Sequence, residues 1–189
     1  MIDEFAKDYL HGDLREVREE LLGKLDGLAE YDVRRPLTRT GTNLLGLVKH
    51  LTLTEARSFG EIFGRPYPEP LPSWDDPAAR GKDMWATEHE PRDRITDAYR
   101  RAWAHSDKTI TELPIDAEGH VPWWPRPNVK LFTILVHVLT ETSRHTGHAD
   151  ILREHLDGKT ATAAHRDESF WAARHAEIER AARAARGPK

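Results

Sequence analysis

The sequence predicts an all-α protein built around four long helices, and three features of the chain support this prediction. Apolar side chains recur three and four residues apart along four segments, which is the spacing of one face of a helix. No segment shows the alternation of apolar and polar residues that is typical of strands joined by hairpin turns. Two proline-containing stretches separate the helices, because proline interrupts regular hydrogen bonding. Four such amphipathic helices are typical of a helical bundle.

The first two helices are defined by their leucines. Helix one is expected over residues 13–29, with Asp13 as its N-cap, and residues 1–11 are compatible with a short preceding helix. Helix two is expected over residues 43–63, with Thr42 as its N-cap and a glycine and a proline after it.

The remaining helices follow two loops. Residues 64–90 contain five prolines and are expected to form a long loop, of the kind that often carries function. Helix three, over 91–113, opens with proline at its first helical position. After a second loop over 114–128, helix four is expected over 129–155 and stops before a glycine. A final amphipathic helix is expected over 167–185.

The chain is predicted to divide into a four-helix bundle, residues 1–158, and a C-terminal extension, residues 159–189. We expect the extension to pack on the bundle and its end to be frayed, because the last residues are small and basic. The exposed half of the final helix is also compatible with a homodimer.

Composition excludes several classes of protein. The 189 residues carry a net charge of -4, and basic residues are mixed with acidic ones, which argues against nucleic-acid binding. No apolar run is long enough to span a membrane, and the N-terminus does not resemble a signal peptide. A cytoplasmic protein is therefore expected. Because the sequence has no cysteine, any metal must be held by nitrogen and oxygen ligands.

Helix four carries a carboxylate and two imidazoles on what its spacing predicts to be the inner side. Glu141, His145 and His148 follow one another at intervals of four and three residues, so a helix places them on one face. Burying these groups is costly unless a partner such as a metal ion satisfies them. His50 flanks the apolar side of helix two and can meet Glu141 and His145 if the two helices are neighbours. Three protein ligands would leave coordination positions open for water or substrate.

Several of these residues also have ordinary alternatives. Taken alone, His50 is more often a core histidine hydrogen-bonded to a neighbour. His148 is a fourth ligand, a residue that orients a ligand, or a general base. His137 either hydrogen-bonds Glu141 one turn later or is a surface histidine. Glu55, on the apolar side of helix two, is interpreted as the buried partner of an arginine.

Two motifs resemble the DinB-like metalloprotein superfamily. Thr40-Gly-Thr-Asn-Leu-Leu-Gly-Leu-Val-Lys-His-Leu51 is similar to its helix-two signature. The stretch from His137 to Gly158, which contains Glu-Thr-Ser-Arg-His-Thr-Gly-His, is similar to its helix-four signature, and the wording is closest to a largely actinobacterial branch. The resemblance implies an up-down-down-up four-helix bundle with a metal at its centre. Characterised members include S-transferases that use mycothiol or bacillithiol and a mycothiol-dependent maleylpyruvate isomerase.

The resemblance also implies a ligand set. The ligands of the superfamily fall on His50, Glu141 and His145, and the maleylpyruvate isomerase-like members also have glutamate at the position of Glu141. This sequence departs from the pattern at His148, where many members have glutamine.

The expected function is that of a metal-dependent enzyme, either a thiol S-transferase or a thiol-assisted isomerase, acting on a small molecule. Zinc is the first choice of metal, with nickel or iron as alternatives, and a low-molecular-weight thiol would be the cosubstrate. His148 and His137 are expected to have catalytic roles in proton transfer. Two alternatives stay open: a metal-dependent hydrolase or non-haem iron enzyme, and a non-catalytic metal-binding or stress-response bundle.

Overall fold

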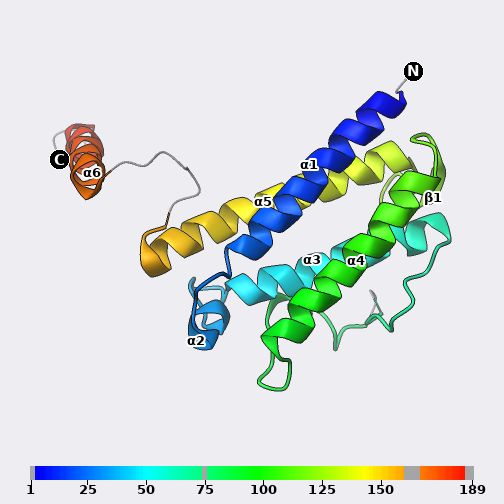
Figure 1. Ribbon diagram of the computed structural model, residues 1–189, viewed down its shortest axis with the longest axis horizontal. Helices are drawn as coiled ribbons and strands as arrows, with labels where there is room; N and C mark the ends of the chain where they lie inside the picture. Colours follow the sequence, from blue (N-terminus) through cyan, green and yellow to red (C-terminus); the bar gives the residue numbers. More distant parts are fainter. Residues whose placement is uncertain (1–2, 74–75, 160–166, 186–189) are drawn as a thin grey trace. The chain divides into compact units, whose positions relative to one another are not determined.

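The computed structural model describes residues 3–73, 76–159 and 167–185, and most of these are helical (Figure 1). The chain forms two compact units, Met1–Lys159 and Thr160–Lys189. Among the described helices, none combines the length and the apolar character that crossing a bilayer requires. The mostly helical fold agrees with the sequence-based prediction.

Four long helices form the framework of the first unit. In Figure 1, α1 runs alongside α5, and α3 lies next to α4. Contacts of α3 with α5 and of α1 with α4 complete the packing. The up-down-down-up order implied by the superfamily stays a prediction. The bounds of the four helices are α1 (Glu4–Gly23), α3 (Leu44–Phe59), α4 (Arg92–Glu112) and α5 (Leu131–Asp157).

Short elements connect these helices. A two-stranded antiparallel sheet, which the sequence-based prediction missed, joins α4 to α5, and Gly119 pairs with Val129 in its centre. Its strands are too short to show the alternation by which strands are detected. The short elements are α2 (Glu30–Arg34), the 3₁₀ turns η1 (Glu61–Phe63) and η2 (Lys82–Met84), and the strands β1 (Glu118–His120) and β2 (Asn128–Lys130).

Helix α1 begins earlier than predicted. Its N-cap is Asp3, whose side chain accepts a hydrogen bond from the backbone N–H of Ala6 at 3.1 Å, and the helix continues through Gly12 and Asp13. One internal glycine costs a helix only about 1 kcal/mol, which the packing of the buried leucines later in α1 outweighs. The separate short helix compatible with residues 1–11 is therefore part of α1.

The start of α3 is tied to η2 by a side chain. Asn43, not Thr42, is the N-cap, and its Oδ1 accepts a hydrogen bond from the backbone N–H of Gly46 at 2.8 Å. The Nδ2 of Asn43 donates to the carbonyl oxygen of Met84 at 3.3 Å. The backbone of Met84 lies so close to Gly46 that a side chain at position 46 would collide with it. This docking places η2 along α3.

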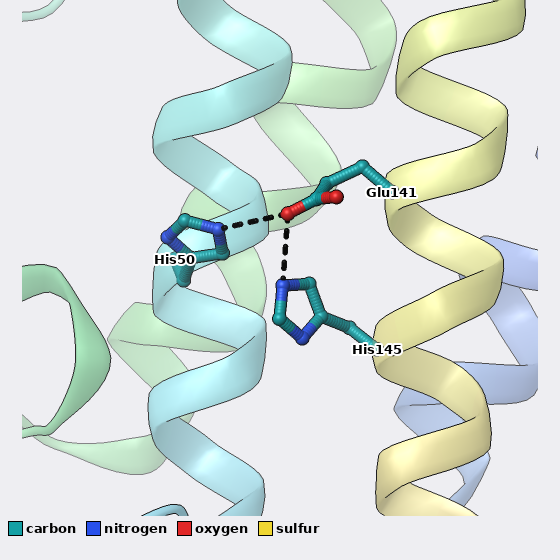
Figure 2. A group of neighbouring side chains, drawn as sticks. All are labelled: His50, Glu141 and His145. Atoms are coloured by element: carbon teal, nitrogen blue, oxygen red, sulfur yellow. Dashed lines mark hydrogen bonds and ion pairs between the residues drawn. The ribbon is translucent and has the colours of Figure 1, made fainter.

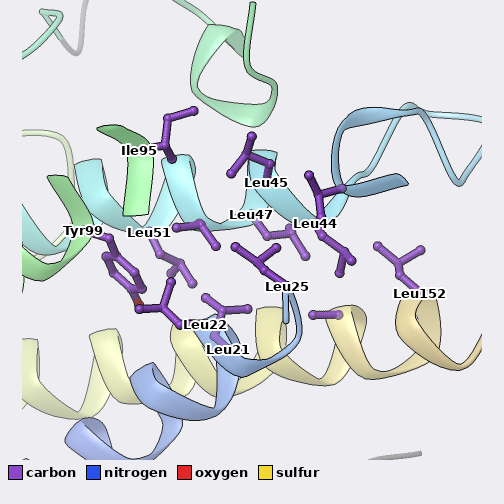
Figure 3. Packing of buried hydrophobic residues seen from close by; sticks show 13 residues of the cluster. Leu21, Leu22, Leu25, Leu44, Leu45, Leu47, Leu51, Ile95, Tyr99 and Leu152 are labelled. Atoms are coloured by element: carbon purple, nitrogen blue, oxygen red, sulfur yellow. The ribbon is translucent and has the colours of Figure 1, made fainter. Parts of the chain in front are cut away.

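Two apolar clusters fill the interior of the first unit. Figure 3 shows the first cluster, in which leucines of α1 and α3 pack against Tyr99 and Ile95 of α4 and against Leu152 of α5. The second cluster contains Phe59, Ile110 and residues from the first half of α5. The candidate site lies on the α3–α5 side of this framework.

A buried ion pair joins α1 to α3, as the sequence predicted for Glu55. Arg18 donates hydrogen bonds from Nε and Nη2 to the two carboxylate oxygens of Glu55, both at 2.7 Å, and the side chains are 1% and 0% exposed. Arg18 also donates to Asp107 of α4 at 2.6 Å. Such a two-pronged, charge-assisted contact constrains the relative position of the three helices.

The second unit contains α6 (Glu168–Ala184), which closely matches the predicted final helix. Asp167 is its N-cap and accepts a hydrogen bond from the backbone N–H of Phe170 at 2.9 Å. The packing of this unit on the bundle stays a prediction, and residues 186–189 of the expected frayed end lie outside the described part of the chain.

Candidate metal centre

Helices α3 and α5 bring together the three residues that the sequence singled out as metal ligands. Figure 2 shows one carboxylate oxygen of Glu141 directed toward both His50 and His145. One carboxylate oxygen of Glu141, Oε1, lies 3.1 Å from His145 Nε2 and 3.8 Å from His50 Nε2. One ligand atom from each of the three residues lies within 4.8 Å of the others. In the described part of the chain, this is the one group with such geometry.

The local sequence explains how each side chain reaches the group. Glu141 and His145 are one turn apart on α5, so their side chains point the same way. His50 on α3 follows the buried Leu47 and precedes the buried Leu51, which pack α3 against its neighbours. Because α3 contacts α5, the ring of His50 meets that of His145 edge to face, with the centroids 5.0 Å apart.

The buried strip of α5 differs from the predicted stripe at two positions, where Thr142 and Ala149 are buried in place of Glu141 and His148. Its inner residues include Val138, Thr142, His145, Ala149 and Leu152. Thr142 and Ala149 are small or only weakly apolar, so the spacing of apolar residues did not identify them as buried. The predicted stripe members Glu141 and His148 lie at the edge of this strip, with Glu141 22% exposed.

The electrostatics of the group keep it ready to bind a cation. Burial alone would raise the pKa of Glu141, but His145 and Arg144 beside it outweigh this effect and hold the pKa below its usual value. Burial, together with nearby His50, lowers the pKa of His145. An anionic carboxylate and a neutral imidazole are the forms that bind metal ions.

The outer nitrogen atoms of both histidines are engaged. His50 Nδ1 lies 2.6 Å from the carboxylate oxygen Oδ2 of Asp83, and His145 Nδ1 lies 3.3 Å from Nδ1 of His148. When a histidine Nδ1–H donates to such a partner, the lone pair of Nε2 is left for a metal. In both residues, Nε2 is the nitrogen that faces Glu141.

Sequence reasoning missed Asp83. It lies in η2, within the segment predicted as loop, and no local motif distinguishes it from the other acidic residues there. It reaches His50 only because the N-cap Asn43 and the close approach at Gly46 dock η2 on α3. No local feature of the sequence marks this docking.

The two residues expected to transfer protons lie outside the three-residue group. The ring of His148 is exposed and lies beside that of His145, with centroids 5.3 Å apart. His137 is also exposed, and its ring meets that of Trp124 with centroids 4.9 Å apart. The structure thus places His148 next to the ligand group and His137 against the loop that precedes β2.

The donor set fits a divalent metal ion. Ligand atoms about 2.1 Å from a tetrahedral zinc ion lie about 3.4 Å from one another. The distances from Oε1 of Glu141 to Nε2 of His145 and to Nε2 of His50, 3.1 Å and 3.8 Å, lie on either side of this value. Two imidazole nitrogens and a carboxylate oxygen suit zinc, nickel or iron(II). Three protein ligands would leave positions for water or a substrate atom.

The fold and the site define a helical protein with a histidine–glutamate–histidine candidate metal centre between two of its long helices. No curated protein matches the sequence. The sequence model of the mycothiol S-transferase family matches residues 9–158, which include all three residues of the group. The chain belongs to this family, which is DinB-like, and the resemblance found from the two motifs is confirmed.

Proposed function

We propose that the protein is a metal-dependent thiol S-transferase that uses mycothiol as its thiol substrate. The observation that carries the proposal is the convergence of His50, Glu141 and His145 in a chain of the mycothiol S-transferase family. Zinc is the proposed metal. Because low-molecular-weight thiols are kept reduced in the cytoplasm, we propose that the enzyme acts there.

A bound divalent cation lowers the pKa of a coordinated thiol, so that the thiolate forms near neutral pH. His50, Glu141 and His145 would hold the cation, and Asp83 would keep His50 in the tautomer that presents Nε2. His148, exposed beside His145, is the proposed acceptor of the thiol proton. His137 keeps only a supporting role in the proposal, because its ring lies against Trp124.

The proposed reaction forms one carbon–sulfur bond. With a halide substrate, the thiolate displaces the halide ion, and the thiol proton passes to His148 and then to solvent. With an epoxide, the ring oxygen takes up the proton as its bond to carbon breaks. In a thiol-assisted isomerisation, the thiolate adds to an activated double bond and leaves again after rotation, so the thiol is regenerated.

Metal content and thiol dependence test the proposal together. We expect about one equivalent of metal in the purified protein, no bound metal in His145→Ala, and retained metal in His148→Ala. Incubation with mycothiol and a panel of halides, epoxides and activated alkenes should yield adducts or isomers only when metal is present. His148→Ala should slow this reaction, and because the residue is exposed, added imidazole should restore part of the rate.

Three results would contradict the proposal. Stoichiometric metal in His145→Ala would refute the ligand assignment. Iron(II) with oxygen uptake in the absence of thiol would favour the non-haem iron alternative. A metal-loaded protein that forms no adduct with any thiol and electrophile would favour a non-catalytic bundle.

A further inference from the structure

A large pocket lies beside the candidate metal centre and is separate from it. Its volume is about 610 Å³, within the range of small-molecule sites, and α3, α4 and the segment between them line it. The three residues of the histidine–glutamate–histidine group do not line this pocket. Asp83 lines it and also contacts His50, so this side chain connects the pocket to the candidate metal centre.

Positive charge predominates among the described residues that line the pocket. The lining contains three acidic and five basic side chains, and all three acids have partners. Glu90 accepts hydrogen bonds from Lys49, and Asp83 lies at hydrogen-bond distance from His50. The basic residues are Lys49, Arg57, Arg80, Lys82 and Arg94.

Four of the five basic side chains retain unused donors. The side chains of Arg80 and Lys82 are exposed and make no hydrogen bond or ion pair with another residue of the described chain. Arg94 is also exposed and makes no hydrogen bond there, although its charge helps to lower the pKa of Glu69. Arg57 donates from Nη2 to the carbonyl oxygen of Pro72, but its Nε is buried without a partner in the described chain. A buried donor without a partner, such as Nε of Arg57, is expected where a ligand supplies the acceptor, and the exposed cationic side chains are free to exchange water for an anionic group.

Part of the pocket lining is apolar. Leu53 of α3 is partly buried, and Ile95 of α4 is 6% exposed and belongs to the first apolar cluster. An apolar wall next to several cationic donors is complementary to a ligand with a hydrocarbon body and an anionic group.

We propose that this pocket binds a small organic anion, whose carboxylate, sulfonate or phosphate group contacts Arg80, Lys82 and Arg94. The apolar body of the ligand packs against Leu53 and Ile95. The inference does not rest on the proposed function, because the pocket holds none of the three candidate metal ligands. Its ligand would sit on the side of Asp83 that faces away from the metal centre.

Two matched probes test the proposal by calorimetric titration of the full-length protein. Naphthalene sulfonate carries the anionic group, and naphthalene methanol is an uncharged analogue of similar size. We expect the sulfonate to bind at least about tenfold more tightly than the alcohol at low ionic strength, and added salt to reduce this difference.

Two double variants locate the binding site. Arg80→Gln with Lys82→Gln should weaken sulfonate binding about tenfold, because both side chains line the pocket. Arg100→Gln with Lys108→Gln removes the same charge from exposed positions of α4 that do not line the pocket, and should leave binding within about twofold. Thermal unfolding should show that both variants are folded, since all four side chains are exposed.

Equal affinities for the sulfonate and the alcohol would overturn the proposal, because binding would then not depend on the anionic group. Equal weakening by the two double variants would also overturn it, since net charge alone would then account for binding. A loss confined to the pocket variant, with selectivity for the sulfonate, would support it.

Discussion

Replacing Asp83 by alanine is expected to weaken zinc binding about ten- to thirtyfold, although Asp83 would not contact the metal. The carboxylate of Asp83 lies 2.6 Å from His50 Nδ1, which is the distance of a strong, charge-assisted hydrogen bond. Such bonds contribute about 1.5–3 kcal/mol. Asp83 is 23% exposed, so water replaces part of the contact, and we take the lower half of that range, about 1.5–2 kcal/mol. At about 1.4 kcal/mol per tenfold change, this gives the stated loss of affinity.

Competition titration with a chromophoric chelator at neutral pH would measure the zinc affinity of the metal-free protein. Asp83→Asn should weaken binding less than Asp83→Ala, because the amide oxygen still accepts the hydrogen bond without its charge. Asp76→Ala is the matched control, since Asp76 has the same charge and lines the same pocket but hydrogen-bonds the backbone of Ala78. It should keep the affinity of the natural sequence.

The reasoning would be refuted if Asp83→Ala bound zinc as tightly as the unchanged protein. It would also be refuted if Asp76→Ala weakened binding as much, because the effect would then come from the charge of the segment and not from the contact with His50.

Three further perturbations test other parts of the structure. Glu55→Gln should lower the free energy of unfolding by about 1.5–3 kcal/mol in urea titrations, because buried Arg18 would lose its two-pronged contact with a carboxylate and keep Asp107 as its charged partner. A change below about 1 kcal/mol would contradict this. Gly46→Ala places a Cβ 1.9 Å from a backbone carbonyl oxygen of η2, so it should lower the free energy of unfolding by about 1–3 kcal/mol and weaken zinc binding. In the control Gly147→Ala, the added Cβ meets no atom within 4 Å, so neither property should change. The pKa of His145 in the folded protein lies below its ordinary 6.5, so the unfolded chain binds the proton first as the pH falls. The metal-free protein should therefore lose stability between pH 6.5 and the folded pKa. His145→Asn should flatten this pH dependence, and an unchanged slope would disprove the reasoning.

The long helices could be predicted because their leucines recur with helical spacing, but their exact ends could not. Asp3 and Asp13 are equally suitable N-caps in chemical terms, and Thr42 is only somewhat less suitable than Asn43. Which of them caps the helix depends on how far tertiary packing extends it. The hairpin of β1 and β2 was missed because its three-residue strands carry no detectable periodicity.

The candidate site could be predicted in part for a similar reason. Glu141 and His145 are neighbours on one helix, so their spacing alone brings them together. The meeting with His50 depends on the contact between α3 and α5, which the sequence left conditional and the structure supplies. The sequence did not predict the exposure of His148, because the neighbouring Ala149 is buried in its place and a small residue adds little to the apolar pattern.

The segment between α3 and α4 both lines the pocket and, through Asp83 in η2, contacts His50, and the anchoring of η2 to α3 keeps these two roles in different parts of the segment. One end of the segment between α3 and α4 is fixed where the backbone N–H of Arg65 donates to the carbonyl oxygen of Gly60, and the other where Asn43 and Lys49 contact Met84 and Glu90. Residues 66–73 and 76–81, the described part of the segment between these anchors, contribute to the pocket wall but not to the histidine–glutamate–histidine group. If the proposed metal centre and the proposed anion pocket are both right, a chimaera that exchanges only this stretch for that of a related protein should change the preference for anions and leave metal binding in place. The segment would then be a separate unit for redesigning selectivity.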